Sequence, residues 1–376
     1  MKVINMKKII AVISFSDLEN DSRVKRQIDL ISNNFNVITI GFGSYRRSLD
    51  HLQINNKNCF FKKLFFLFLI ITRRYKTYFK IRFEFKKIIE FINKYKVSCY
   101  ILNDSNSWPF AEYLQNKKYI IDAHEYSLDE LSDNNLWRLI FKPLKKWSAQ
   151  YIINSHARFS VEKNICAKWE KATKKEFILL RNCSSYSQIR ITNNKNKIFK
   201  IIHHGIAEPS RKIENMIHAI GECGKSYKGT FYLKSNNKEY LNYIIKISKK
   251  NNVEILEPIN ENLLINEGNK FDIGIMSIYP SNLNYKYCLP NKLFQFIQSR
   301  IPIISGPTPS IKKIIEKYDI GKVAKSFEIH DISETIKTLT KYDIKRMKIN
   351  CDLAAKELCW EKEGMVLIKE IEKMME

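Results

Sequence analysis

The fold is indicated most strongly by residues 289–306, whose sequence is LPNKLFQFIQSRIPIISG. Proline is favoured at the first position of a helix, where its missing N–H costs nothing and its φ is already set, so Pro290 predicts a helix start. Apolar side chains then recur at helical spacing on one stripe: Leu293, Phe294 and Ile297. The β-branched pair at 303–304, closed by Ser305-Gly306, predicts a buried strand. The stretch therefore predicts a helix that leads into a strand of an α/β sheet.

Lys292 is the unusual residue of this helix start. A cation in the first turn opposes the helix dipole, so we expect an anion to compensate it. Free N–H groups at a helix N-terminus, together with an ammonium group, form a ready phosphate site. The alternative, which this stretch leaves open, is a solvated surface lysine.

The chain has 376 residues, a length typical of about two domains. Its 64 Lys and Arg against 39 Asp and Glu leave a net charge of +25. Such an excess favours anionic partners, namely nucleic acid, an acidic lipid surface or phosphorylated substrates. No zinc-finger, basic-zipper or RNA-recognition signature accompanies it, so we expect no nucleic-acid partner.

The cysteines and the apolar runs indicate the compartment. The eight cysteines are scattered singly without a CxxC pair, which is typical of reduced thiols. The apolar run 9–13 is too short for a signal peptide, and the run 64–71 falls well short of the roughly 20 residues that span a bilayer. We therefore expect a cytoplasmic protein.

Two sets of apolar runs, interleaved with helical patterns, predict two parallel sheets. The first set of expected strands covers residues 8–14, 35–41, 98–104, 119–125, 151–155 and 177–182. The second set covers residues 199–205, 230–234, 253–256, 272–277 and 303–304. Residues 184–197, rich in Ser, Asn, Thr and Lys, predict a linker between the sets. The fold class is α/β, with ligands expected outside the carboxyl ends of the strands.

Residues 60–87 differ from the rest of the chain in composition, because phenylalanines alternate there with lysines and arginines. Basic residues interleaved with large apolar ones suit a helix that lies in an anionic membrane interface. The alternative is an ordinary amphipathic helix pair that packs on the sheet and exposes a basic face. The sequence leaves both open.

Two further polar clusters follow predicted strands, where an α/β enzyme keeps its site. In residues 122–125, His124 comes directly after a buried strand and is flanked by carboxylates, so it could orient a hydroxyl or exchange a proton. Its alternative is a loop histidine with local bonds. In residues 205–212, Ser210 is a possible helix cap and two cations, Arg211 and Lys212, open a helix.

The cations of this cluster and Lys292 together indicate a diphosphate. Each opens a helix after a strand of the same expected domain, and Arg211 can grip a phosphate through two parallel hydrogen bonds. No HxxxH or HxxE spacing predicts a zinc site, and no GxSxG motif predicts a hydrolase.

These motifs resemble those of GT-B-fold glycosyltransferases, in particular the large retaining group often called family 4. Residues 21–24 (DSRV) resemble the start of the first helix in many bacterial members, and residues 122–125 (DAHE) match their D-x-H-E strand end. Residues 204–214 resemble their strand, loop and R-x-I-E helix. The most specific match lies in 289–294 and 301–304, which resemble the P-N-K signature of members that build bacterial surface polysaccharides.

The resemblance implies a GT-B architecture, with two Rossmann-like doubly wound parallel-sheet domains that face each other across a cleft. Residues 1–185 would form the acceptor-side domain and residues 186–355 the nucleotide-sugar-binding domain. Residues 356–376 would form a helix that packs back on the N-terminal domain.

By the same resemblance, the chain would transfer a sugar from a nucleotide diphosphate sugar to a lipid-linked saccharide, as in capsule, O-antigen or lipopolysaccharide synthesis. The reaction would retain the anomeric configuration and need neither cofactor nor metal, the donor being a co-substrate. The basic, phenylalanine-rich stretch at about residues 60–87 further suggests, on its own composition, that the protein is peripheral on the inner face of the plasma membrane and held by its anionic surface.

The resemblance also assigns site residues. The catalytic residues would be His124, Arg211 and Lys292. The donor-binding residues would be Gly205, Lys212, Pro290, Asn291, Leu293 and Gln295. The acceptor-side residues would be Asp17, Asp21, Arg23, Asp122 and Glu125.

Some positions depart from the family pattern. Tyr287 and Gln295 stand where the family usually has a pair of glutamates, and Arg300 stands where it usually has glycine. The glycine-rich loop expected after the first strand is replaced by 14–16 (SFS). These departures motivate an alternative function, a catalytically silent GT-B module that binds donors or partners in a polysaccharide assembly complex.

Overall fold

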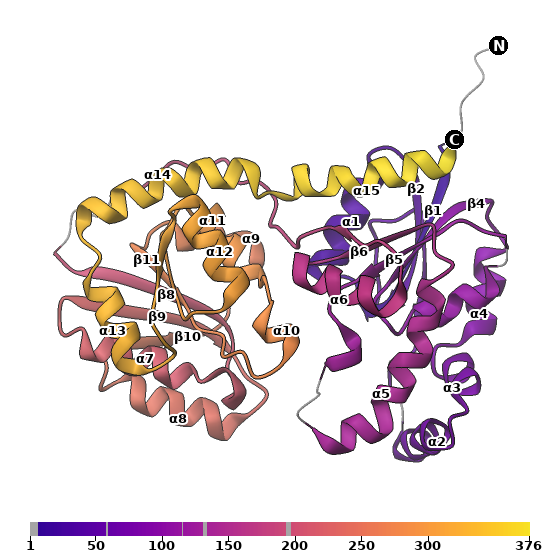
Figure 1. Ribbon diagram of the computed structural model, residues 1–376, viewed down its shortest axis with the longest axis horizontal. Helices are drawn as coiled ribbons and strands as arrows, with labels where there is room; N and C mark the ends of the chain where they lie inside the picture. Colours follow the sequence, from indigo (N-terminus) through magenta and orange to yellow (C-terminus); the bar gives the residue numbers. More distant parts are fainter. Residues whose placement is uncertain (1–6, 58, 115, 131–133, 193–196) are drawn as a thin grey trace, which may run out of the picture. The chain divides into compact units, whose positions relative to one another are not determined.

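The computed structural model describes residues 7–57, 59–114, 116–130, 134–192 and 197–376. The chain divides into two compact units (Figure 1). The first unit comprises Met1–Arg181, Asn282–Asn284 and Glu363–Glu376, and the second comprises Asn182–Ser281 and Tyr285–Lys362. Each unit is built around its own sheet of parallel strands.

The first unit holds a seven-stranded sheet in the order β3-β2-β1-β4-β5-β6-β7, with all neighbours parallel. The strands are β1 (Ile9–Asp17), β2 (Asn36–Phe42), β3 (Asp50–Ile54), β4 (Val97–Asn103), β5 (Tyr119–Ala123), β6 (Ala157–Ser160) and β7 (Ile178–Leu179). The central strands are buried almost without interruption, as expected where helices cover both faces of a parallel sheet. The strand order changes direction at β1: the chain first adds β2 and β3 on one side of β1 and then adds β4 and the later strands on the other side.

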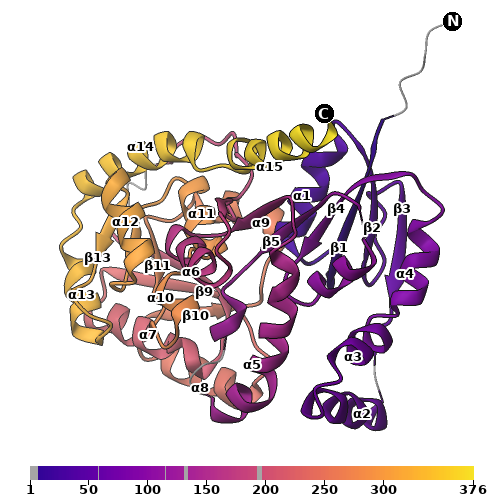
Figure 2. The ribbon, with the colours of Figure 1, turned by 45° about the vertical axis from the view of Figure 1, so that its right-hand side comes forward.

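Helices connect these strands. They are α1 (Ser22–Ser32), α2 (Phe60–Ile71), α3 (Tyr75–Arg82), α4 (Phe85–Ile92), α5 (Asn135–Ala149), α6 (Lys163–Thr173) and α15 (Trp360–Met375), with 3-10 turns η1 (Trp108–Tyr113), η2 (Ser127–Asp129) and η3 (Gln150–Ile152). Figure 2 shows α2, α3 and α4 following one another along one side of the unit. From Glu363 onward α15 belongs to this unit, where Glu363 accepts hydrogen bonds from the backbone and side chain of Arg181.

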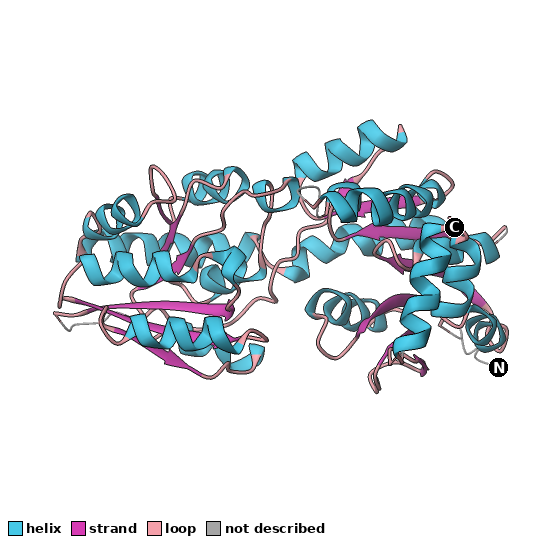
Figure 3. Ribbon diagram, turned by 90° about the horizontal axis from the view of Figure 1, so that it is seen from below, coloured by secondary structure: helices cyan, strands magenta, loops and turns pink. Residues whose placement is uncertain are grey.

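The second unit holds a six-stranded parallel sheet in the order β10-β9-β8-β11-β12-β13. The strands are β8 (Phe199–Ile206), β9 (Tyr227–Lys234), β10 (Val253–Leu256), β11 (Ile273–Met276), β12 (Ile303–Ser305) and β13 (Gly321–Val323). The helices are η4 (Pro209–Arg211), α7 (Ile213–Glu222), α8 (Lys238–Ser248), α9 (Glu261–Gly268), α10 (Leu283–Lys286), α11 (Asn291–Gln298), α12 (Pro309–Tyr318), α13 (Ile329–Lys337) and α14 (Lys341–Glu357). Figure 3 shows helices on both faces of the strands, and the core accordingly forms two apolar clusters.

The expected strand at 151–155 is wrong. Residues Gln150–Ile152 form η3, and the strand that pairs with β5 is β6, from Ala157 to Ser160. Ile152 is buried whereas Ile153 is 46% exposed, so the short apolar run does not supply the continuous burial of a central strand. Periodicity alone cannot separate a strand from one buried helical turn in so short a run.

The predicted linker is only partly described, because residues 193–196 lie outside the described part of the chain. Residues 180–192 form neither helix nor strand but are fastened to the second unit from Asn182 on. The backbone N–H of Ser187 donates to Gln298 Oε1 at 3.0 Å, and its carbonyl accepts from Arg300 at 2.8 Å.

Arg300, the residue that departs from the family's glycine, has a φ of +58° and is fully buried. A left-handed conformation normally favours glycine, because a Cβ is strained there. The guanidinium offsets that strain with hydrogen bonds to Asp352 Oδ1 at 2.8 Å and to the Ser187 carbonyl. Its plane also lies 5.3 Å from the centre of the Tyr186 ring.

Candidate active site

The second unit contains a cavity of about 110 Å³ beside β8 and just beyond β11. A single water needs about 10–15 Å³ on this measure, so the cavity has room for a considerably larger group. Its polar side chains are His203, Ser210, Arg211, Ser277, Tyr279, Tyr285 and Lys292. Two of these are cations, and none of the described residues that line the cavity is acidic. The cavity is therefore suited to an anion.

Lys292 reaches the cavity from the first turn of α11 and is only 9% exposed, so the alternative of a solvated surface lysine is wrong. Burial, together with the charge of Arg211, lowers the pKa of Lys292 to about 7. The chain makes room for this side chain at Gly205, whose φ is +139°. A Cβ at that position would lie 3.1 Å from Lys292 Nζ.

His203 is the polar neighbour of Lys292. Its Nδ1 lies 2.8 Å from the carbonyl oxygen of Ile275, which can only accept, so Nδ1 carries the proton. The other nitrogen, Nε2, is then an acceptor and lies 3.4 Å from Lys292 Nζ. Burial and the charge of Lys292 hold the pKa of His203 well below its ordinary value. A neutral imidazole thus orients the ammonium group without neutralising its charge.

Arg211 lies at the end of η4, on the same cavity. The expectation that Ser210 caps a helix with Arg211 and Lys212 in its first turn is wrong. Pro209 begins a 3-10 turn, Lys212 takes a φ of +46°, and α7 starts only at Ile213. The Tyr240 hydroxyl accepts the hydrogen bond from the Ile213 N–H at 3.1 Å, the role expected of Ser210.

Of the other donor-binding candidates, some line the cavity and some do not. Pro290 lines the cavity. It precedes α11, which begins at Asn291, and is not the first helical residue that the sequence predicted. Lys212 is outside the lining and lies over the Tyr279 ring at 4.4 Å.

Asn291, Leu293 and Gln295 have partners in the second unit. Asn291 accepts a hydrogen bond from Asn182 at 2.6 Å, and Leu293 is fully buried in the core. Gln295 is 6% exposed and donates to Glu261 Oε1 at 3.2 Å. The described residues that line the cavity do not include any of these three.

Several lining residues were missed from the sequence: His203, Ser277, Tyr279, Tyr285 and Cys288. Ser277 ends the predicted strand at 272–277, and the strand-end rule could have found it. His203 gave no such signal, because it lies inside a predicted strand and looks like a core residue.

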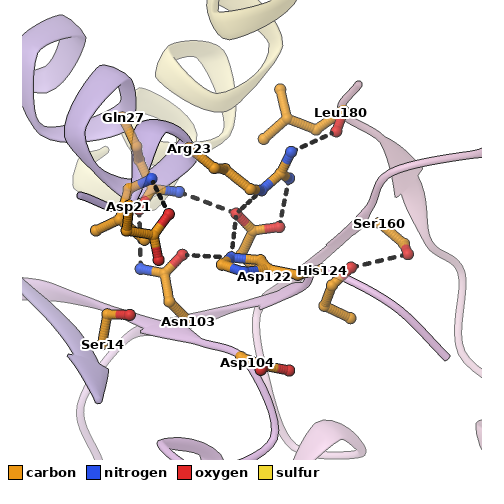
Figure 4. Close-up of polar contacts among 12 residues, drawn as sticks. Ser14, Asp21, Arg23, Gln27, Asn103, Asp104, Asp122, His124, Ser160 and Leu180 are labelled. Atoms are coloured by element: carbon orange, nitrogen blue, oxygen red, sulfur yellow. Dashed lines mark hydrogen bonds and ion pairs between the residues drawn. The ribbon is translucent and has the colours of Figure 1, made fainter. Parts of the chain in front are cut away.

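The first unit holds a separate polar network, shown in Figure 4. Arg23 of α1 binds Asp122 of β5 through two hydrogen bonds, Nε to Oδ2 at 2.9 Å and Nη2 to Oδ1 at 2.6 Å. A third bond joins Arg23 to the carbonyl of Leu180 at 3.0 Å. Burial alone would raise the pKa of Asp122, but the charge and hydrogen bonds of Arg23, with the nearby His124, hold that pKa well below its ordinary value. Arg23 and Asp122 thus form a buried ion pair in which each charge compensates the other, and this pair connects α1 to the sheet.

His124 extends this network toward solvent. Its Nε2 lies 3.1 Å from Asn103 Oδ1 and 3.7 Å from Asp122 Oδ2, while its side chain stays 22% exposed. Burial would lower the pKa of His124, but the nearby carboxylate of Asp122 outweighs it and raises the pKa. The imidazole is held by two neighbouring strands, β4 and β5, rather than by bonds within its loop. It can therefore offer a fixed, protonatable group at a strand end.

The remaining acceptor-side candidates differ in environment. Asp17 accepts from Asn20 Nδ2 at 2.8 Å, and Asp21 caps α1 by accepting from the Val24 N–H at 3.2 Å. Glu125 is different, because burial, with the charges of Asp104 and Glu130, raises its pKa to about 8. Asp21 thus stabilises the start of α1, whereas Glu125 can hold a proton near neutral pH.

Among the described residues, no group of three or more His, Cys, Asp and Glu side chains stands close enough together to hold a metal ion. No helix in the described ranges has the length and apolar character needed to cross a membrane.

Comparison with known proteins establishes the fold. No family model matches the sequence, and no curated protein matches it either. Among solved structures, the sucrose-phosphate synthase of Thermosynechococcus elongatus is similar, with a TM-score of 0.73, 11% identity and coverage of 98% of this chain and 99% of that one. A glycosyltransferase from Rickettsia africae matches with a TM-score of 0.69, 11% identity and coverage of 98% and 99%. A trehalose-6-phosphate structure from E. coli, bound with UDP-2-fluoro glucose, matches with a TM-score of 0.69, 8% identity and coverage of 97% and 99%. The predicted α/β class with two Rossmann-like domains is confirmed, and the fold is that of the GT-B glycosyltransferases.

Proposed function

We propose that this chain is a glycosyltransferase that takes its sugar from a nucleoside diphosphate sugar. The observation that carries the proposal is the pairing of Arg211 and Lys292 on one cavity, which no acidic residue of the described part of the chain lines. Their mutual repulsion contributes to the low pKa of Lys292, and a bound diphosphate would relieve it. The similar E. coli structure carries a UDP-sugar analogue, which supports this donor class.

The two cations would act on the leaving group. Arg211 can bind a phosphate through two parallel hydrogen bonds, and Lys292 can neutralise the charge that develops as the sugar–phosphate bond breaks. His203 would keep Lys292 pointed into the cavity. Fixed cations of this kind can stabilise a leaving diphosphate without a divalent metal, so we propose metal-independent transfer with retention, as in the family 4 group.

The first unit is assigned the acceptor. We propose that His124 acts in the transfer, since it is held firmly and takes up a proton readily. Glu125, protonated near neutral pH, is its neighbour and a candidate for binding an acceptor hydroxyl. The proposed acceptor is a lipid-linked saccharide in surface-polysaccharide synthesis. The similar sucrose- and trehalose-phosphate synthases are named for sugar phosphates, which makes a hexose phosphate the acceptor to test beside it.

The test is a panel of UDP- and GDP-sugars, with transfer and donor hydrolysis followed by mass spectrometry. Arg211→Ala and Lys292→Ala should each lower turnover at least about tenfold, because each removes a charged contact to phosphate. The matched control is Lys246→Ala, which removes an exposed lysine of α8 in the same unit. Full activity of both cavity variants would overturn the assigned roles.

A catalytically silent module is the second candidate. It is favoured by Tyr287 and Gln295 in place of the usual acidic pair, and by the engagement of Gln295 with Glu261. Calorimetric binding of a nucleotide sugar without turnover on any acceptor of the panel would support it. Turnover with any donor would exclude it.

A further inference from the structure

Helix α2 (Phe60–Ile71) presents a large apolar surface that the structure leaves uncovered. One side of the helix is packed, because Phe66, Leu69 and Ile70 are buried and α2 contacts α3 and α5. Phe66, for example, meets the Tyr78 ring edge-on at 5.7 Å. α2 is thus fastened to the first unit by one face, and Figures 1 and 2 show it at the end of that unit, with α3 between it and the sheet.

The other side of α2 forms what we call the α2 patch, which consists of Phe60, Phe61, Leu64, Phe65, Phe68 and Ile71. These side chains are 45% to 80% exposed, Phe61 the most. At 3.6 residues per turn they fall within about 140° of arc, so they form one continuous stripe. An ordinary amphipathic helix would bury such a stripe. Helix α3 does so with Tyr75 and Phe79, but α2 does not.

The charged residues of the segment that carries the α2 patch have one sign. Residues 60–83 contain no Asp or Glu. Their basic residues are Lys62, Lys63, Arg73, Arg74, Lys76, Lys80 and Arg82. Lys62, Lys63, Arg73 and Arg74 lie on α2 or directly after it, and all are exposed.

This charge pattern selects the occupant. A second copy of the chain seated on the α2 patch would bring like charges together, which opposes association. A membrane with anionic headgroups satisfies both features at once, because the aromatic side chains enter the acyl boundary and the flanking cations meet the headgroups.

We propose that α2 lies in the interface of an anionic membrane and docks the protein there through the α2 patch. The side chains of Phe61 and Phe65 enter the lipid, and Lys62, Lys63, Arg73 and Arg74 contact the headgroups. The inference rests on the exposure and charge of α2 and does not depend on the proposed sugar transfer.

The test is co-sedimentation of the full chain with vesicles of phosphatidylcholine alone or mixed equally with phosphatidylglycerol. The wild type should bind the mixed vesicles, bind pure phosphatidylcholine weakly, and lose affinity as salt is raised. Phe61→Glu combined with Phe65→Glu should weaken binding at least about tenfold, because carboxylates replace inserted rings next to an anionic surface. Phe66 is left unchanged because it is buried and its loss would risk the fold.

The matched control is Tyr342→Glu combined with Leu353→Glu, two exposed apolar residues of α14 in the other unit, 77% and 59% exposed. It adds the same charge and should leave vesicle binding unchanged. Thermal unfolding and UDP-glucose affinity of each variant are measured in parallel. Unchanged affinity for UDP-glucose separates loss of docking from loss of the donor site.

Three results would overturn the proposal. They are a wild type that does not bind the mixed vesicles, a patch variant that binds them as well as wild type does, and a control variant that loses binding equally. If light scattering shows instead that the wild type is a dimer and the patch variant a monomer, the α2 patch is a contact between copies.

Discussion

Raising the pH from 6 to 9 should weaken the binding of UDP-glucose, because Lys292 loses its proton in this range. Its pKa is about 7, since it is buried and lies near Arg211. Above that value the protonated fraction falls about tenfold per pH unit, to about 1% at pH 9. If only the ammonium form contacts the diphosphate, the dissociation constant rises by up to about 100-fold, which matches the roughly 1.5–3 kcal/mol of a charged hydrogen bond.

The assay is isothermal calorimetry of UDP-glucose binding at half-unit steps of pH. UDP-glucose is suited to it because both of its phosphates are esterified on two sides and do not titrate here. His203 is expected to stay neutral, because burial and the charge of Lys292 hold its pKa well below its ordinary value. Among the residues that line the cavity, Lys292 is therefore the one expected to give the slope, and its replacement tests this directly.

Lys292→Met is the decisive variant, because it keeps the length of the side chain and removes the titrating group. It should bind UDP-glucose weakly at pH 6 and show no slope up to pH 9. A flat profile for the wild type would refute the reasoning, as would an unchanged slope in Lys292→Met.

Three further outcomes are expected. Arg23→Met should lower the free energy of unfolding by about 3–5 kcal/mol, measured by urea denaturation, because it leaves the buried carboxylate of Asp122 without its counter-charge; a change below 1 kcal/mol would contradict the buried pair. The stability that Asp122 supplies is present above its usual pKa of 3.8, because the folded pKa is lower, and should be lost as pH falls below that value; urea midpoints from pH 5 to 2 check this, and Arg23→Met should flatten the loss. Gly205→Ala should reduce UDP-glucose affinity about tenfold and destabilise the chain by about 1–3 kcal/mol, since alanine is strained at this φ and its Cβ crowds Lys292; wild-type affinity would show that the lysine has room to move.

Much of the second unit could be predicted from the sequence because its signals are local. The stretch 289–306 combines a proline start, an apolar stripe and a β-branched run, and α11 and β12 follow these signals closely. The strand-end rule likewise brought Arg211 and Lys292 to one site from positions far apart in the chain, and both line the cavity.

The rest depends on contacts that no local pattern contains. His203 is set by the carbonyl of Ile275, which lies 72 residues away. Arg23 finds Asp122 across 99 residues, so a pair that motif comparison assigned to the acceptor side is also a buried tie between α1 and the sheet. Helix α7 starts later than predicted, because a 3-10 turn that begins at Pro209 precedes it and the Tyr240 hydroxyl takes the place of the expected serine cap.

Helix α2 shows the same limit in another way. Its sequence left two alternatives open, because hydrophobicity does not tell which face of a helix is covered. The structure shows apolar residues on both faces, with only Phe66, Leu69 and Ile70 buried.

The buried Arg300 has an evolutionary consequence. This one side chain hydrogen-bonds to its near neighbour Gln298 and to two residues distant in the sequence, Ser187 and Asp352. A relative with glycine at position 300 gains a relaxed backbone but leaves Asp352 with Lys356 alone as its ion-pair partner. Mutation at one of these positions should thus alter which residues are tolerated at the other, so positions 300 and 352 should change together across descendants of a common ancestor.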